Sequence, residues 1–213
     1  IMGFTSISVF NSVVYYSLNY TQVLNGVLMI STIPVFIIFF SGLFKTESIR
    51  IYQIIGVVIS LLGVISIITK LDLSLLLSLK LNKGDLWMLV AMISWTTYSL
   101  LLGKKKVKLE PFIFLQTIII IGLLFLLPMY IAEVFAGKKI TLNFPVLMTI
   151  GYVVFFAGIG AYTFWNAAIK LIGPSRSGVF LHLMPIFSSL MAVFLLGEQF
   201  SFHHIVGLSL IHI

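Results

Sequence analysis

Long apolar runs, separated by short polar breaks or breaks containing glycine and proline, dominate the chain from its first residue. A bilayer core about 30 Å thick is crossed by a helix of roughly 20 apolar residues. Runs of that length predict seven complete spans, at residues 1–19, 23–44, 50–70, 84–103, 112–134, 146–171 and 176–197. The run 202–213 is shorter, and we expect a truncated span there. The segment 71–83 is apolar but too short and too interrupted to span, so we expect it to lie as a loop in the membrane interface.

Composition agrees with an all-α polytopic membrane protein. Of the 213 residues, 60% are hydrophobic and 9% are charged, whereas a soluble domain carries about 25% charged residues. Soluble, disordered and nucleic-acid-binding classes are therefore excluded. Cysteine is absent, which removes disulfides, thiolate metal sites and a cysteine nucleophile.

The net charge of +7 bears first on topology, because Lys and Arg collect in cytoplasmic loops. The connections after even-numbered spans hold eight Lys or Arg residues, and those after odd-numbered spans hold five. This bias predicts that the loop from Lys104 to Lys108 is cytoplasmic and that Ile1 lies near the cytoplasmic face.

An internal repeat appears when the chain is aligned with itself at an offset of 151 residues. Five positions are identical: Pro34, Phe36, Glu47, Ile54 and Gly56 fall on Pro185, Phe187, Glu198, Ile205 and Gly207. The matched spans are five apart, and an odd separation means that the two copies cross the membrane in opposite directions. Inverted repeats are typical of secondary transporters.

The repeat predicts two domains, 1–70 and 84–213, joined by the interfacial linker 71–83. The second copy holds five spans and the first holds three, so we expect two further helices before Ile1 and about ten in the intact protein. The chain would then be a fragment that lacks the first two helices and the C-terminal end.

The stretch 168–207 resembles the EamA domain of the drug/metabolite transporter superfamily, and 18–56 fits the same pattern. The shared features are Pro34 and Pro185, each followed 13 residues later by a Glu and 9 residues after that by a Gly. Gly84, Asp85 and Trp95 look like the opening of the second repeat, and Tyr162, Trp165 and Ala168 look like its third helix. The resemblance implies a ten-helix exporter of metabolites, amino acids or drugs in the bacterial inner membrane, driven by an ion or solute gradient.

The repeated residues have two interpretations each. Glu47 and Glu198 are proton-coupling carboxylates or, as their places at span ends favour, interfacial anchors and ion-pair partners. Pro34 and Pro185 each remove a backbone hydrogen bond within a span, which produces either a packing kink or a gating hinge. Their matched places in the two copies favour gating.

Polar and aromatic side chains within spans are the candidates for a substrate cavity, because each is costly in hydrocarbon unless it faces a partner or water. Interhelical hydrogen bonding explains any single one equally well. His182 could also carry a coupling proton, since histidine titrates near neutral pH. The predicted cavity residues are Asn11, Trp95, Tyr98, Tyr162, Trp165, Asn166 and His182.

Motifs for catalysis, cofactors or metals are missing. The chain carries neither a complete dinucleotide fingerprint nor a nucleophile elbow, and His203 and His204 lack the spacing of metal ligands. We therefore predict a transporter of small solutes without cofactor or metal. A non-transporting scaffold or receptor, and a membrane-embedded transferase acting on lipid-linked substrates, remain alternatives.

Overall fold

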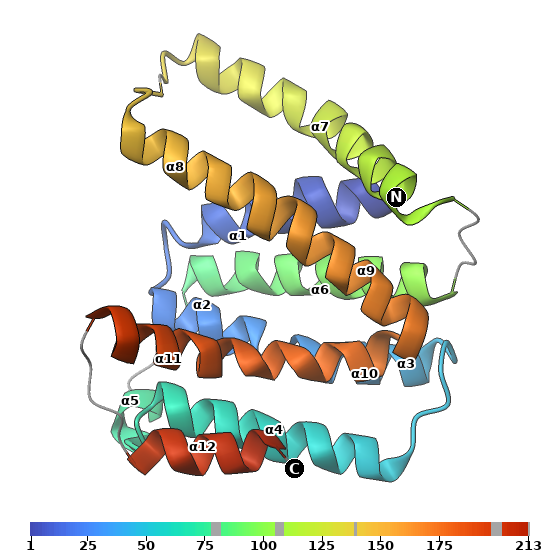
Figure 1. Cartoon of the computed structure of the whole chain (residues 1–213), viewed down its shortest axis with the longest axis vertical. Coiled ribbons are helices and arrows are strands. Elements are labelled where there is room, and N and C mark those ends of the chain that lie inside the picture. The colour runs from blue at the N-terminus through green and yellow to red at the C-terminus, as the bar shows by residue number, and fades with distance from the viewer. Residues whose placement is uncertain (78–81, 105–108, 139, 197–201, 213) are drawn as a thin grey trace.

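The computed structural model describes residues 1–77, 82–104, 109–138, 140–196 and 202–212, and within these ranges every regular element is a helix. Here η1 and η2 are π-helices and η3 is a 3₁₀-helix (Figure 1). In chain order the elements are η1 (Phe4–Phe10), α1 (Asn11–Ser17), α2 (Val23–Ile30), α3 (Ile33–Leu43), α4 (Ile51–Ile68), α5 (Leu73–Leu77), α6 (Lys83–Lys104), α7 (Pro111–Phe135), α8 (Phe144–Tyr152), η2 (Val153–Gly160), α9 (Ala161–Ile172), α10 (Pro174–Val179), η3 (Phe180–His182), α11 (Leu183–Leu196) and α12 (Phe202–His212).

The helices confirm an all-α membrane protein. Within the described residues, five stretches are long and apolar enough to cross a membrane: Asn25–Leu43, Ile51–Ile68, Lys83–Lys104, Pro111–Phe135 and Phe144–Ile172. The other predicted spans are also helical but shorter or interrupted, as η1 with α1, as α10 with η3 and α11, and as α12. The segment 71–83 differs from a simple loop, because it contains the five-residue helix α5.

The predicted span 23–44 is divided in two, and a proline explains the division. Pro34 lies at the start of α3 and has no N–H to continue the hydrogen-bond ladder. The N–H of Val35 bonds the Thr32 carbonyl at 3.0 Å, whereas an uninterrupted helix would use the carbonyl of Ser31. The matched Pro185 likewise stands at the start of α11, directly after η3.

Three pairs of helical segments separated by about 151 residues run in opposite directions (Figure 1). The pairs are η1–α1 with η2–α9, α2–α3 with α10–α11, and α4 with α12. The correspondence extends to local irregularities, since both members of the first pair open with a π-helix and both members of the second are broken near the middle. The fold thus carries the inverted arrangement that the repeat predicted.

Glycines set the closest helix contacts. A Cβ on Gly63 would lie 2.8 Å from the Gly207 carbonyl oxygen, so α4 and α12 pack with their backbones almost touching. Gly122 of α7 is equally close to η1, where its carbonyl accepts a 2.7 Å hydrogen bond from Ser8 Oγ. Small residues are what membrane helices use for such approaches.

The start of α6 is fixed to the turn between α1 and α2. A Cβ on Gly84 would lie 2.5 Å from the Ser17 carbonyl oxygen. The buried carboxylate of Asp85 accepts hydrogen bonds from Thr21 Oγ1 at 2.5 Å and from the Asn82 N–H at 2.9 Å. This Gly–Asp pair therefore attaches α6 to the α1–α2 side of the molecule, and α6 becomes the centre of the core.

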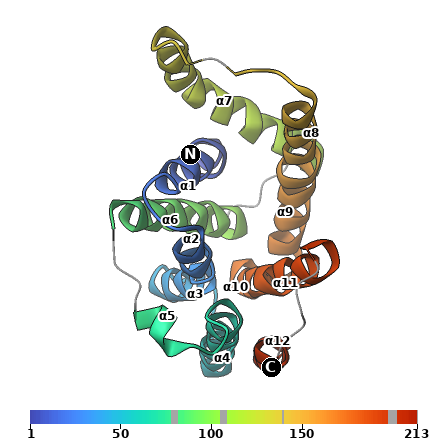
Figure 2. The same cartoon turned by 90° about the vertical axis from the view of Figure 1, so that its left-hand side faces the viewer.

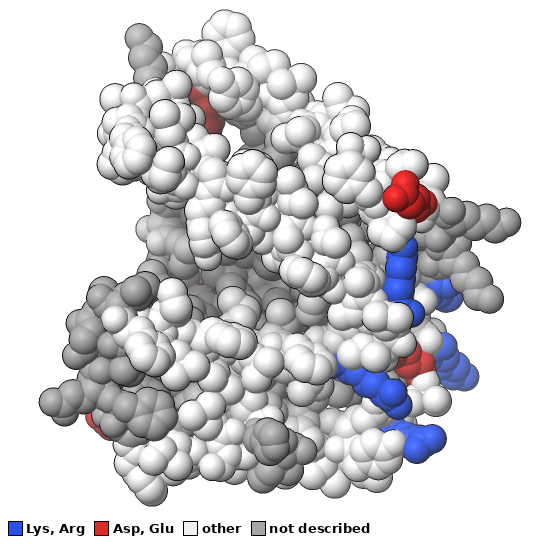
Figure 3. Space-filling model, in the orientation of Figure 1, with Lys and Arg blue, Asp and Glu red and all other residues white. Residues whose placement is uncertain are grey.

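The two ends of the helices differ in charge. We call them the Lys45 end, where α3, α6 and α9 finish, and the Tyr20 end, where α1 and α7 finish. On the face drawn in Figure 3, the basic side chains gather at the Lys45 end. The described basic residues there are all exposed: Lys45, Arg50, Lys104, Lys170 and Arg176.

Helices α7 and α8 form a hairpin on the outside of the molecule. Large apolar side chains are exposed along both, including Phe125 of α7 and Phe144 and Leu147 of α8, as suits helices in contact with lipid. Figure 2 shows the C-terminal part of α7 standing away from α1.

Candidate functional site

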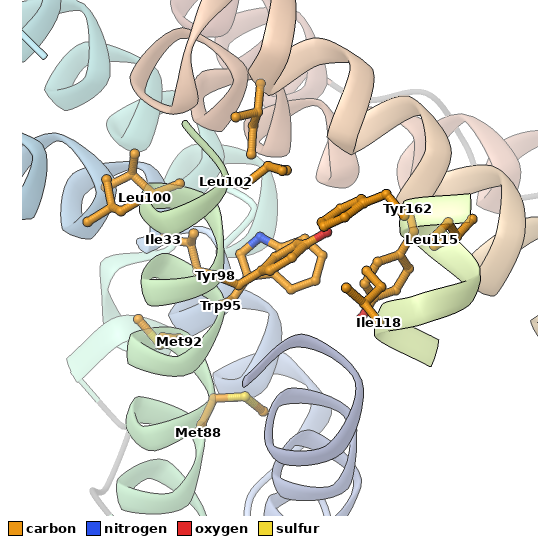
Figure 4. Packing of buried hydrophobic residues seen from close by; sticks show 13 residues of the cluster. Ile33, Met88, Met92, Trp95, Tyr98, Leu100, Leu102, Leu115, Ile118 and Tyr162 are labelled. Atoms are coloured by element: carbon orange, nitrogen blue, oxygen red, sulfur yellow. The ribbon is translucent and has the colours of Figure 1, made fainter. Parts of the chain in front are cut away.

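Six of the seven predicted cavity residues form one cluster at the centre of the molecule. They come from three separate elements, α1, α6 and α9, and Figure 4 shows the Trp95 ring beside Tyr98 and Tyr162. Ring centroids of Trp95 lie 5.6 Å from Tyr98, 5.5 Å from Tyr162 and 5.4 Å from Trp165. The members of this aromatic cluster are Asn11, Trp95, Tyr98, Tyr162, Trp165 and Asn166.

Two of these residues lie just after the π-helices η1 and η2. Asn11 directly follows η1, and Tyr162 is the second residue after η2. The Asn11 amide donates to Tyr162 Oη at 3.2 Å, and that hydroxyl donates to the Ser6 carbonyl at 2.7 Å. π-helical turns are rare and occur often at functional sites, and here one stands before each partner of this contact, at equivalent places in the chain.

Other hydrogen bonds complete the aromatic cluster. Tyr98 Oη donates to Asn166 Oδ1, and the Trp165 indole donates to Ser99 Oγ at 3.3 Å. The Trp95 indole N–H is buried and has no hydrogen-bond partner within the described part of the chain. A buried donor of this kind costs free energy unless something accepts from it, so Trp95 offers a free N–H at the junction of the three elements.

The aromatic cluster is packed, and a pocket of about 1030 Å³ lies next to it, between α1 and α7. α7 contacts η1, the segment that leads into α1, at Ser8 and Gly122. From there α1 and α7 run in parallel and separate toward the Tyr20 end. The lining begins at Ser12, one turn beyond Ser8, and at Leu123, the residue after Gly122. The lining residues are Ser12, Tyr15, Tyr16, Asn19, Tyr20, Leu123, Leu126, Leu127, Met129, Tyr130, Glu133 and Lys138.

This pocket was not predicted from the sequence. Its α1 wall repeats polar and tyrosine residues every three to four positions, from Ser12 through Tyr15 and Tyr16 to Asn19, and this spacing puts them on one face. That pattern was visible in the sequence, but the α7 residues that form the opposite wall, from Leu123 onward, lie more than 100 residues further along the chain. An ion pair between Lys138 and Glu133, 2.8 Å long, stands at its mouth.

His182 lies outside the aromatic cluster. It is found where the broken helix α2–α3 packs against the broken helix α10–α11. Its Nε2 is 2.9 Å from the Ser31 carbonyl oxygen, which can only accept, so Nε2 carries a hydrogen. Nδ1 lies 2.6 Å from Ser60 Oγ of α4 and accepts from that hydroxyl when the ring is neutral. The structure therefore brings six of the seven predicted residues together in one packed cluster and places His182 at a separate position.

Glu47 contacts the opposite broken helix. Its carboxylate accepts a 3.0 Å hydrogen bond from the N–H of Ser175 at the start of α10. Glu47 does not form the ion pair that was expected with a neighbouring basic residue, because the one ion pair among the described residues joins Lys138 and Glu133. Its counterpart Glu198 lies outside the described residues.

The two glycines of the repeat have different surroundings. Gly207 of α12 packs closely on α4, where an added Cβ would overlap Ile67. Gly56 of α4 has open space around it and lines a small pocket of about 130 Å³ with Ser60 and Arg176. Among the described residues, no three His, Asp or Glu side chains come close enough to hold a metal ion; the side chains of His203 and His204 are not described.

Antiparallel sets of membrane-crossing helices, meeting at matched π-helical and broken segments, define a polytopic membrane protein of the inverted-repeat class. The model of the EamA-like transporter family matches residues 1–69 and 82–213. The chain belongs to this family and is a membrane transporter rather than an enzyme.

Named relatives and a solved structure agree. "Uncharacterized transporter YyaM" of Bacillus subtilis is 25% identical over 215 residues, which cover 99% of this chain and 69% of that protein. An "Uncharacterized transporter" of Archaeoglobus fulgidus is 26% identical over 207 residues, 97% of this chain and 70% of that protein. A crystal structure with 16% sequence identity shares the fold with a TM-score of 0.77, over 99% of this chain and 71% of its own.

Proposed function

We propose that this protein is a secondary transporter that exports small metabolites, amino acids or drugs across the bacterial inner membrane by alternating access. The two halves are the units 1–70 and 84–213, joined by the linker 71–83. In this proposal, the Lys104–Lys108 loop and the whole Lys45 end face the cytoplasm. The excess of Lys and Arg at that end supports the orientation, and family membership supports export of small solutes.

The pocket between α1 and α7 is the observation that carries the proposal. Its two walls come from different halves of the chain, so a relative movement of the halves would widen or close it. Its volume of about 1030 Å³ suits a small organic molecule. Four tyrosines, Asn19 and Ser12 give it polar groups on an otherwise apolar wall.

In the proposed pathway, solute leaves toward the Tyr20 end through this pocket, after passing the aromatic cluster. Trp95 would meet the solute with its free indole N–H, and the solute would also contact the neighbouring side chains of the aromatic cluster, Tyr98, Tyr162, Trp165, Asn11 and Asn166. Pro34 and Pro185 would serve as hinges, because each stands at the break of its helix.

The proton is the coupling ion in this proposal, with His182 as its carrier. His182 is fully buried, and the groups that face its two nitrogens are the Ser60 hydroxyl of α4 and the Ser31 carbonyl between α2 and α3. Ser60 can donate to a neutral ring or accept from a protonated one, since a hydroxyl does both. The site therefore accommodates either protonation state without rearrangement of the helices.

The test uses the full-length protein in proteoliposomes loaded with a mixture of amino acids, metabolites and drugs. Efflux is measured by mass spectrometry with and without a pH gradient. We expect selective loss of one solute class, and we expect Ser12→Trp to reduce that loss strongly by placing an indole in the pocket between α1 and α7. Phe155→Trp is the matched control because Phe155 is 67% exposed on the lipid side. Retention of every solute by folded protein would contradict the proposal and favour a scaffold.

A further inference from the structure

Two hydrogen bonds join residues that occupy equivalent positions in the two halves. Asn11 bonds Tyr162, and the Ser31 carbonyl accepts from His182, and both pairs are 151 residues apart. Equivalent residues are exchanged by the two-fold axis that relates inverted repeats. A pair of equivalent residues in contact must therefore lie on that axis, and these two contacts mark its course through the molecule.

A third set of contacts between the halves lies off this axis, at the Lys45 end. Glu47 accepts from the Ser175 N–H at 3.0 Å, and Ser175 Oγ donates to Ser41 Oγ at 3.2 Å. These partners are 128 and 134 residues apart, so they are not equivalent positions. Ser41 and Ser175 are almost completely buried. We call the contact among Glu47, Ser41 and Ser175 the clamp.

The chain is built to make this off-axis contact. Gly173 has a φ of 85°, a conformation that glycine adopts without strain, and it turns the chain from α9 directly into α10. The N–H of Ser175 is thereby left at the start of a helix, where a carboxylate is favoured by the helix dipole as well as by the hydrogen bond. Glu47 supplies that carboxylate from the end of α3.

We propose that the clamp holds the Lys45 end shut in this state and releases in the opposite state, while Asn11–Tyr162 and Ser31–His182 persist as the pivot. When inverted halves exchange conformations, every contact between them is replaced by its symmetry equivalent. A contact on the axis is its own equivalent and is kept, whereas an off-axis contact is lost at one end. The proposal rests on the proposed function, because only alternating access requires the Lys45 end to open.

Accessibility of single cysteines tests the clamp without any knowledge of the substrate, and the native chain contributes no cysteine of its own. Val57→Cys reports the small pocket at the Lys45 end, and Ser12→Cys reports the large pocket toward the Tyr20 end. Each reporter is combined with Glu47→Ala. We expect the labelling rate at position 57 to rise by about fivefold and the labelling rate at position 12 to fall. A change of about fivefold in the population of the open Lys45 end is what the loss of one carboxylate at a helix N-terminus produces. Glu47→Gln, which keeps an acceptor oxygen, should shift labelling less. Unchanged labelling at both reporters in Glu47→Ala would overturn the clamp.

A covalent bridge provides the second arm. Ser41→Cys with Ser175→Cys should crosslink under oxidation or with a short thiol crosslinker, fix the Val57→Cys reporter in its protected state and stop efflux until reduced. Leu18→Cys with Gly26→Cys is the control, because a Cβ on Gly26 would lie 3.2 Å from Leu18 Cδ2 and both residues belong to the half 1–70, which we expect to move as one unit. Efflux that survives the 41–175 bridge, or is lost equally with the 18–26 bridge, would overturn the proposal. A protein that transports nothing but still shifts its labelling would count against the proposed function alone.

Discussion

Replacing His182 by Phe should destabilise the protein by about 1–3 kcal/mol, the cost of leaving a buried polar group without its partner. His182 is fully buried, and Phe keeps most of its ring volume while removing both nitrogens. The Ser60 hydroxyl loses little, because it can turn to a carbonyl of its own helix. The N–H that an uninterrupted helix would direct at the Ser31 carbonyl, that of Val35, is already bonded to the Thr32 carbonyl, so Ser31 loses its partner with His182. The unpaired Ser31 carbonyl therefore accounts for most of the expected loss in the free energy of unfolding.

Thermal unfolding in detergent, followed through the fluorescence of the three tryptophans, measures this cost. For a chain of this length, 1 kcal/mol corresponds to about 2–4 °C in Tm, so we expect His182→Phe to lower Tm by roughly 3–10 °C. His182→Gln is the matched variant, because its amide N–H reaches about the position of Nε2, and its Tm should fall less. Equal Tm values for His182→Phe and the parent, or equal losses for both variants, would refute the reasoning. His182→Gln cannot carry a proton, so its efflux should also lose its dependence on the pH gradient.

Three further substitutions test the packing. Gly122→Ala should cost about 1–3 kcal/mol by forcing α7 away from η1. Its control, Gly56→Ala, lies in open space and should leave Tm unchanged or raise it by a few degrees. A larger fall in Tm for Gly56→Ala than for Gly122→Ala would show that the close contact between α7 and η1 is not formed. Asp85→Asn should cost about 1.5–3 kcal/mol in chemical denaturation, since a carboxylate acceptor of two hydrogen bonds is replaced. Tyr162→Phe should cost about 1 kcal/mol through loss of its bond to the Ser6 carbonyl, and the exposed Tyr152→Phe should cost nothing by the same melt.

The spans and their directions were predictable because they depend on local properties. The length of an apolar run fixes whether a helix can cross the bilayer, and the run 112–134 became α7, Pro111–Phe135, with a difference of one residue at each end. The break in the span 23–44 was visible as Pro34, because proline removes its hydrogen bond whatever surrounds it. The repeat supplied the antiparallel pairing, since equal spacing of Pro, Glu and Gly reflects an equal fold.

The candidate site was predictable only in part. Polar residues in apolar spans must find partners, and this reasoning selected Asn11, Tyr98 and Tyr162, which do come together. It could not separate His182 from them, because the crossing of two broken helices is a property of the tertiary structure. The large pocket was missed for the same reason, since its walls are set by the contact of Ser8 with Gly122, 114 residues apart.

The position of a residue relative to the two-fold axis decides what its substitution can reveal. A contact on the axis, such as the hydrogen bond between His182 and the Ser31 carbonyl, is made in both proposed states. Its loss therefore changes the free energy of the two states alike and should lower Tm without altering which end is open. A residue off the axis, such as Glu47, contributes to one state only, and a difference in free energy between states is what shifts their populations. Stability and accessibility measured together on the same variants therefore distinguish pivot from clamp. In this family fold, a variant with normal Tm but altered labelling is the informative one for transport.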